Sequence, residues 1–345
     1  MSEQKPLCLC DYPKEYSFYG IDLIKFICAY LVCMIHVPLF QGITSPFLDT
    51  LSFALKNGIA RIAVPFFFSA SGFLLFRKIS IYSLDKVRIK KYCYKLLFLL
   101  GLWTTLLIVG FTDHLWYLSG LVIVTIVFSA LWSKKKSFKW IFIISGMLYL
   151  FGLFGDSYSC VLDRLLIEHG WNSLNGVLSV IYNQQTRAFI LGVFFAFVFY
   201  SIGVFMAYRP IRISMVFAVV GFVISVSLLL FESFSISRIG ESYDHNMYLS
   251  LIPTTFFLLY IATHLNLSSS TIYKKLRAVG VLIFFLHIMV YALIKNGIAV
   301  TNSAIGMDLS AFTFLIVVII VTTLAFFIEY LSHKNRFGFL RILYS

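Results

Sequence analysis

The segment that begins at Lys25 places a charged and a titratable side chain inside an apolar run. It reads KFICAYLVCMIHV, and His36 lies eleven residues after Lys25. On an α-helix eleven residues turn through about 1100°, so both side chains share one face, about 16 Å apart. Asp22 precedes Lys25 by three residues and can pair with it on that face. An imidazole in this place can act as a general base near neutral pH.

A second apolar run carries an arginine close to a proline. It reads RIAVPFFFSASGFLLF and begins at Arg61. Pro65 cannot donate to the carbonyl of Arg61, which predicts a locally opened helix at the charged position. Ser69 and Ser71 then allow close helix packing or line a cavity. A charged side chain is costly in hydrocarbon, so Arg61 indicates a functional site.

Simpler structural roles stay open for the same side chains. Lys25 can extend its ammonium group to the inner headgroups, and His36 can donate a hydrogen bond that only supports packing. Arg61 can likewise pair with outer headgroups.

Two further imidazoles occur in apolar surroundings. His114 lies in DHLWYL beside Trp116, on the outer side and at the expected level of His36. Interfacial tryptophan is an ordinary membrane anchor, so Trp116 alone says little. His287 lies in FFLHIM near the expected middle of a span, where a structural and a functional role are equally open.

A basic segment follows the second apolar run. Residues 77–95 read RKISIYSLDKVRIKKYCYK and include Arg88 and Lys91. Such a segment attracts anionic lipid, or binds a phosphate-bearing cytosolic ligand through charge-assisted hydrogen bonds. The sequence has no Walker A motif, no dinucleotide fingerprint, no zinc spacing and no GxSxG, so no metal site is expected.

The composition indicates how these side chains are positioned. Hydrophobic residues make up 60% of the chain and charged residues 12%, about half the charged share of a soluble domain. Apolar runs of about 20 residues recur, the length that crosses a bilayer as a helix. We therefore expect an all-α polytopic transmembrane bundle. Its ten expected spans are 17–40, 58–77, 96–112, 115–132, 140–154, 186–208, 213–232, 247–265, 279–295 and 309–331.

The charge pattern predicts the orientation of this bundle. The net charge is +13, and Lys and Arg concentrate in alternate loops, which places both termini in the cytoplasm. We therefore expect a lipid partner and no nucleic acid. One integral domain is expected at 17–331, between cytoplasmic tails at 1–16 and 332–345, with no cleavable signal peptide.

Taken together, these motifs resemble the integral-membrane acyltransferase family 3. IDLIKFICAYLVCMIHV resembles its first span, RIAVPFFFSASGF its second, HLWYL its fourth-span entry and FFLHIMV a late histidine motif. The Phe- and Gly-rich run 186–207 is similar to its sixth span. Within that family the chain also resembles the membrane portion of vancomycin-resistance serine racemases, and their soluble catalytic domain is not expected in it. Lys25 replaces a more usual arginine, and a proline is missing from YKLLFLLGLW.

The resemblance implies an acetyl-CoA-dependent O-acyltransferase of the bacterial cytoplasmic membrane. It would move an acyl group, most simply acetyl, from a cytosolic CoA thioester to a hydroxyl of an envelope glycan, with no bound cofactor. The implied roles are a general base (His36), an oxyanion stabiliser (Arg61), donor binding (Lys25, Arg88, Lys91), acceptor positioning (His114, Trp116) and support (Asp22, Ser69, Ser71, His287).

Other functions remain open at the level of the sequence. The same bundle could transport or sense a small amino acid or sugar without covalent chemistry. A scaffold or export partner is a third alternative, but it gives no reason for Lys25, His36 and Arg61 to lie within apolar runs. Acceptor identity, acyl length, direct or covalent transfer and oligomeric state are all open.

Overall fold

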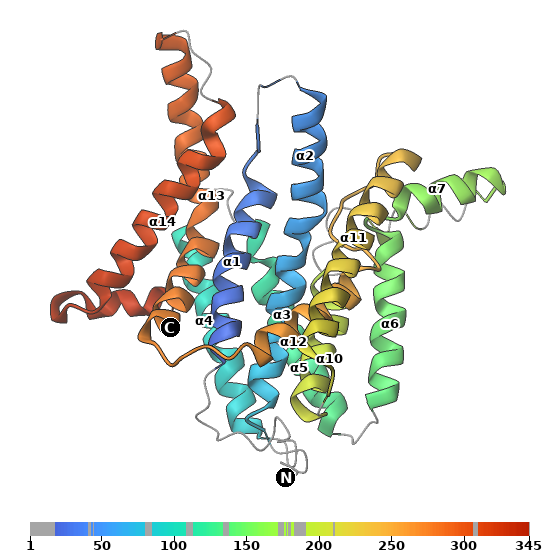
Figure 1. Cartoon of the computed structure of the whole chain (residues 1–345), viewed down its shortest axis with the longest axis horizontal. Helices are drawn as coiled ribbons and strands as arrows, with labels where there is room; N and C mark the ends of the chain where they lie inside the picture. Colours follow the sequence, from blue (N-terminus) through green and yellow to red (C-terminus); the bar gives the residue numbers. More distant parts are fainter. Residues whose placement is uncertain are drawn as a thin grey trace.

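The structure, a computed structural model, is a bundle of helices (Figure 1). It describes residues 18–40, 43, 45–79, 85–107, 113–133, 138–171, 176, 178, 181–182, 191–209, 211–305 and 310–344. The regular elements of these residues are all helical, which confirms the expected all-α class. The expected N-terminal tail, 1–16, lies outside the described residues.

The α-helices vary from 10 to 35 residues in length. They are α1 (Tyr19–His36), α2 (Pro46–Asn57), α3 (Ala63–Phe76), α4 (Lys86–Leu106), α5 (Trp116–Ser133), α6 (Phe138–Phe154), α7 (Ser159–Glu168), α10 (Ala196–Tyr208), α11 (Met215–Ile239), α12 (Leu251–His264), α13 (Thr271–Ile305) and α14 (Thr313–Ser332). Short 3₁₀ or π turns lie between or after them: η1 (Ile59–Ile62), η2 (Asp113–Leu115), η3 (Leu191–Phe195), η4 (Ser310–Phe312) and η5 (Asn335–Leu343).

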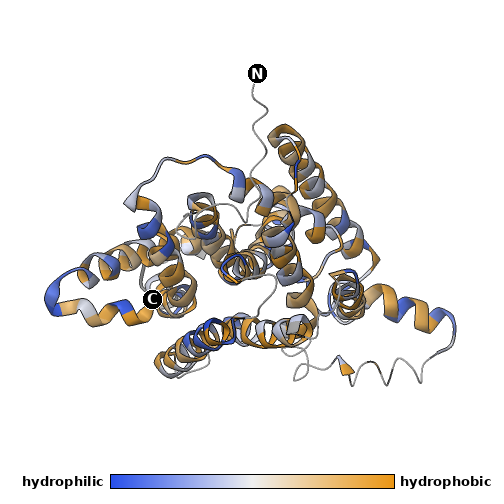
Figure 2. Ribbon diagram, turned by 90° about the horizontal axis from the view of Figure 1, so that it is seen from below, coloured by the Kyte–Doolittle hydropathy of each residue, from blue (hydrophilic) through white to orange (hydrophobic). Residues whose placement is uncertain are grey.

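Five described helical stretches are long and apolar enough to cross a membrane. They are Tyr19–His36, Pro46–Phe76, Met215–Ile239, Thr271–Ile298 and Thr313–Ser332, and α6 with α7 makes a sixth if that pair, bent by 72°, is one span. Figure 2 shows apolar residues along most of the helices and hydrophilic ones mainly in connecting segments and at helix ends. The structure thus supports a membrane protein, but the expectation of ten spans is not confirmed.

The difference has a physical reason. The expected third span is 96–112, and its residues 108–112 lie outside the described residues. Residues 96–106 belong to a helix that begins at Lys86 and ends at Leu106, so the first turns of that helix are basic. Other apolar helices are short: α12 has 14 residues. Several expected spans therefore coincide with described helices that are short or that begin with basic turns, and these are not among the five.

The buried centre of the bundle is α3, which packs against α10. The approach is close enough that a Cβ on Gly203 would lie 1.9 Å from the Ser69 carbonyl oxygen. The break before α3 lies where Pro65 predicts it, because Arg61 sits in the 3₁₀ turn η1 and Pro65 in the first turn of α3.

The C-terminal segment, expected as a tail at 332–345, lies against the bundle. The Trp103 indole on α4 donates to the Leu343 carbonyl at 3.0 Å, and the Ser332 and Tyr344 hydroxyls are 2.6 Å apart. Arg341 Nε donates to the Ser332 carbonyl at 3.2 Å. These contacts join the end of the chain to α4 and α14.

Candidate functional site

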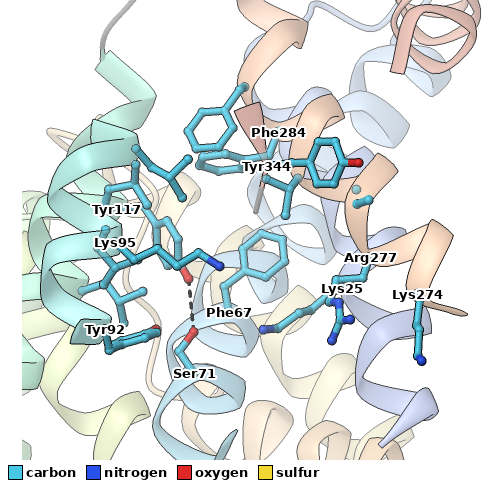
Figure 3. A pocket seen from close by; sticks show the side chains of 18 residues that line it. Lys25, Phe67, Ser71, Tyr92, Lys95, Tyr117, Lys274, Arg277, Phe284 and Tyr344 are labelled. Atoms are coloured by element: carbon cyan, nitrogen blue, oxygen red, sulfur yellow. Dashed lines mark hydrogen bonds between the residues drawn. The ribbon is translucent and has the colours of Figure 1, made fainter. Parts of the chain in front are cut away.

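A cavity of about 580 Å³ lies inside the bundle, between residues of α1, α3, α4, α5 and α13 and the end of the chain (Figure 3). We call it the central pocket. Its lining combines basic, aromatic and aliphatic side chains: Lys25, Phe67, Ser71, Tyr92, Lys95, Leu96, Leu99, Tyr117, Leu118, Leu121, Lys274, Arg277, Ala278, Gly280, Val281, Phe284, Phe285 and Tyr344.

Four basic side chains give the central pocket its charge: Lys25, Lys95, Lys274 and Arg277. Lys95 and Lys25 extend their ammonium groups from opposite sides toward the space between them, with Arg277 beside Lys25 (Figure 3). None of the described residues that line the pocket is Asp or Glu. Asp22 lies behind this lining, and its Oδ1 is 3.8 Å from Arg277 Nη1. The arrangement is suited to an anionic group of a ligand.

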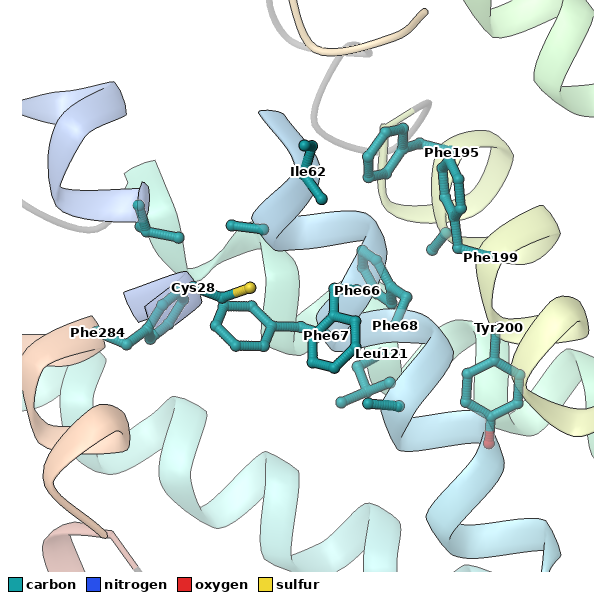
Figure 4. Close-up of a cluster of buried hydrophobic side chains, with 14 of the residues drawn as sticks. Cys28, Ile62, Phe66, Phe67, Phe68, Leu121, Phe195, Phe199, Tyr200 and Phe284 are labelled. Atoms are coloured by element: carbon teal, nitrogen blue, oxygen red, sulfur yellow. The ribbon is translucent and has the colours of Figure 1, made fainter. Parts of the chain in front are cut away.

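The opposite end of the central pocket is apolar and buried. The side chains of Leu118, Leu121 and Phe285 are almost fully buried there. The Trp103 ring stacks on Phe285 with centroids 4.6 Å apart. Phe67, Leu121 and Phe284 also belong to the buried apolar cluster of the bundle (Figure 4). This end is apolar and has few partners for a polar group.

Between the two ends a pair of hydroxyls meets. The Ser71 and Tyr117 hydroxyl oxygens are 3.5 Å apart (Figure 3). Ser71, predicted as a supporting residue, therefore lines the pocket. Ser69, predicted with it, donates instead to the Phe66 carbonyl of its own helix at 3.0 Å.

Three predicted histidines, far apart in the chain, form one cluster. The ring centroid of His287 lies 5.3 Å from that of His36 and 5.3 Å from that of His114, and the last two are 6.4 Å apart. His287 Nδ1 donates to the Phe284 carbonyl at 2.8 Å, because a carbonyl can only accept. Its Nε2 has no hydrogen-bond partner among the described residues.

The histidine cluster borders the central pocket through one aromatic ring. Phe284, which lines the pocket, has its ring centroid 5.5 Å from that of His114. Within the described residues no group of three or more His, Cys, Asp or Glu side chains is placed to hold a metal ion. The three rings therefore lie beside the pocket wall, and the geometry of the described residues gives no support to a metal site there.

Arg61 is engaged by neighbouring protein groups. Its Nε donates to the Lys56 carbonyl at 3.1 Å and one terminal nitrogen to Asn57 Oδ1 at 3.1 Å. The other terminal nitrogen donates to Asn246 Oδ1, and Asp244 Oδ1 is 4.0 Å away. The guanidinium thus ties η1 to the segment between α11 and α12, and it does not line the central pocket.

His245 in this segment is held by the same surroundings. Its Nδ1 is 3.0 Å from the Tyr248 hydroxyl. Partial burial lowers the pKa of His245, and the nearby positive charges of Arg61 and Lys56 lower it further, against the opposing effect of Asp244. The neutral imidazole is therefore favoured here in the folded protein.

The remaining predicted residues lie outside the pocket. Arg88 and Lys91 are exposed on α4, and Arg88 Nε lies 3.0 Å from Asp85 Oδ2. Hydrogen bonds from the Arg88 backbone and side chain lower the pKa of Asp85. Trp116 packs near Phe195, with centroids 6.0 Å apart.

Sequence reasoning missed Lys95, Lys274, Arg277 and Tyr344, which line the pocket. Lys95 is one of several basic residues in the segment 77–95, and its sequence context does not distinguish it from the others. The sequence did contain a pattern that singles out Arg277. Val281 and Phe284 follow it at the i+4 and i+7 positions, so the arginine lies on an apolar face of the helix.

Comparison with known proteins adds three relatives. An amino-acid racemase of Enterococcus faecalis is 28% identical over 92% of this chain and 47% of its own length. A second one from that species is 28% identical over 73% of this chain and 36% of its own. A serine/alanine racemase of Enterococcus gallinarum is 29% identical over 69% of this chain and 36% of its own. No family model and no solved structure matches the chain.

These relatives correct the expected function. The chain spans about half the length, or less, of the curated proteins it matches. They are named racemases, which are isomerases, so the expected acetyl-CoA-dependent O-acyltransferase is wrong in reaction class. The likeness to serine racemases is supported, whereas the likeness to the acyltransferase family is not shown by a family model. Transport or sensing also gains no clear support from these names.

Proposed function

We propose that this chain is the membrane component of an amino-acid racemisation system. In this proposal the central pocket binds a small amino acid, such as serine or alanine, by its carboxylate. The names of the three relatives support the substrate class. The long apolar helices support the location in a membrane.

The observation that carries the proposal is the group of four basic side chains, with no Asp or Glu among the described residues that line the pocket. Arg277 offers a planar fork that suits a carboxylate, and Lys25 and Lys95 add point charges from the other elements. Asp22 lies 3.8 Å from Arg277 and helps to hold its guanidinium in place. These residues would bind and orient the amino acid.

The pocket also has partners for the ammonium group of an amino acid. The Ser71 and Tyr117 hydroxyls can accept hydrogen bonds from it. The rings of Phe67 and Phe284 can attract it through cation–π contacts. Because the carboxylate is the same in both enantiomers, we expect the L and D forms of serine to bind with similar affinity.

Calorimetric titration of the protein in lipid nanodiscs with L-serine and D-serine tests this proposal. Arg277→Gln should weaken binding roughly tenfold, because it removes a charge-assisted hydrogen bond. Lys91→Gln is the matched control: it also removes a cation, but from an exposed position of α4 outside the pocket. Equal loss of affinity in both variants, or no binding of serine or alanine to the wild-type protein, would contradict the proposal.

A further inference from the structure

The central pocket is polar at one end and apolar at the other. Along α13 its lining residues begin with Lys274 and Arg277 and continue with Val281, Phe284 and Phe285. From Arg277 to Phe285 the helix rises about 12 Å. One wall of the cavity therefore changes from basic to apolar along the axis of α13.

The two ends also differ in exposure. The side chain of Arg277 is 55% exposed, and Lys95 and Lys274 are exposed as well. At the apolar end Leu121 and Phe285 are each 2% exposed. These basic lining side chains are thus exposed, whereas these apolar ones are buried.

A small amino acid would leave the apolar end unused. Serine and alanine carry little or no hydrocarbon beyond the charged groups, whereas the cavity of about 580 Å³ has the size of sites for much larger ligands. Water in this end would find few polar partners, because its walls are the side chains of Leu96, Leu99, Leu121 and Phe285. The lining matches a ligand with one anionic head and one hydrocarbon tail.

We propose that the central pocket binds a single-chain anionic amphiphile, a fatty acid carboxylate taken from the membrane. The carboxylate pairs with Arg277 and Lys95, and the tail lies against Leu96, Leu121 and Phe285. The membrane is a natural source, because α4 and α13 both carry exposed apolar side chains, among them Phe98 and Leu293. The bound fatty acid occupies the basic end and so competes with an amino acid there.

Trp103 provides a local reporter for the tail, because its ring stacks on Phe285 at the apolar end. Bromine atoms quench tryptophan fluorescence at short range. We would titrate nanodiscs of saturated phosphatidylcholine that contain the protein with a fatty acid brominated in mid-chain. The expected result is a saturable quenching component that disappears in Trp103→Phe. Trp140→Phe is the matched control, since Trp140 is 57% exposed on α6 and reports the bulk lipid.

Two further variants test the basic end and the apolar end of the pocket separately. Arg277→Gln should shift half-saturation to roughly tenfold higher fatty acid, as one charge-assisted hydrogen bond is lost. Leu121→Phe fills the apolar end and should remove the saturable component. This second variant keeps the test independent of how Trp103→Phe affects the segment that Trp103 holds through Leu343.

The outcomes separate this inference from the proposed function. Saturable quenching without measurable serine binding would overturn the proposed function and support the inference. Serine binding without saturable quenching would overturn the inference alone. Equal quenching by a brominated lysophosphatidylcholine, whose headgroup has no net charge, would show that the basic end does not select the ligand and would also overturn the inference.

Discussion

Arg61 shows how a charged side chain in an apolar run can be used by the fold itself. Its guanidinium nitrogens donate to the Lys56 carbonyl, Asn57 and Asn246. Asn246 is held in turn by Asp156, which accepts from its backbone at 2.7 Å and from its side chain at 3.1 Å. The sequence indicated correctly that Arg61 is unusual, but the pattern could not distinguish a catalytic arginine from one that anchors a distant segment.

His245 in the anchored segment gives a prediction for pH. Its pKa is lowered in the folded protein, mainly by burial and then by Arg61 and Lys56. An imidazole in the unfolded chain titrates near a pKa of about 6.5, so the unfolded state takes up the proton first as the pH falls. Its contribution to stability is present above about pH 6.5 and is lost as the pH falls toward the lowered folded value.

The measurement is the melting temperature between pH 7.5 and 5. We expect it to fall over this range in the wild-type protein and to fall less in His245→Gln, which keeps a polar side chain near Tyr248. An identical pH dependence in the two proteins would contradict the assignment to His245.

The contact of α3 with α10 decides how the central elements are arranged. Gly203 allows α10 to approach the Ser69 carbonyl, where a Cβ would lie only 1.9 Å from the oxygen. Neither helix can relieve such a contact by a rotamer change, because the obstructing atom belongs to the backbone. The Phe- and Gly-rich character of this region was visible in the sequence, but the partner of the glycine was not.

Gly203→Ala should therefore destabilise the protein by about 1–3 kcal/mol, as expected for overpacking. Gly101→Ala is the control: a methyl group at Gly101, an exposed position of α4, would meet no atom within 4 Å, and alanine favours a helix there. Melting temperatures of both variants in the same detergent check the prediction. A Gly203→Ala protein as stable as Gly101→Ala would contradict the packing of α3 on α10.

At the scale of the whole molecule, the sequence indicated candidate site residues best where a polar or charged side chain interrupts an apolar run. His36, His114 and His287 come from α1, η2 and α13, and each stands out in its apolar run although only the fold shows that their rings cluster. The sequence did not predict that Lys95 and Arg277 lie at one site, because basic residues are common in cytoplasmic loops. Only the fold shows that α4 and α13 line the same cavity. The ten expected spans are not confirmed, because several described apolar helices are short or bent and a hydropathy pattern does not distinguish these from full spans.

Reaction class lay beyond the reach of these residue patterns. The Lys, His and Arg residues in apolar runs agreed with the acyl transfer that the resemblance implies, whereas the names of the relatives indicate a different reaction class. What the fold adds is a pocket that Lys25, Lys95 and Arg277 line together, with no Asp or Glu among its described lining residues. The central claim is therefore that the pocket recognises an anionic group of its ligand.

The most direct test of that claim varies the ligand and leaves the protein unchanged. Calorimetric titration in nanodiscs would compare serine with ethanolamine, which has the same ammonium and hydroxyl groups but no carboxylate. We predict saturable binding of serine and an affinity for ethanolamine weaker by roughly a hundredfold, because two or more charge-assisted hydrogen bonds are lost. Equal affinities for the two compounds would contradict carboxylate recognition in the central pocket.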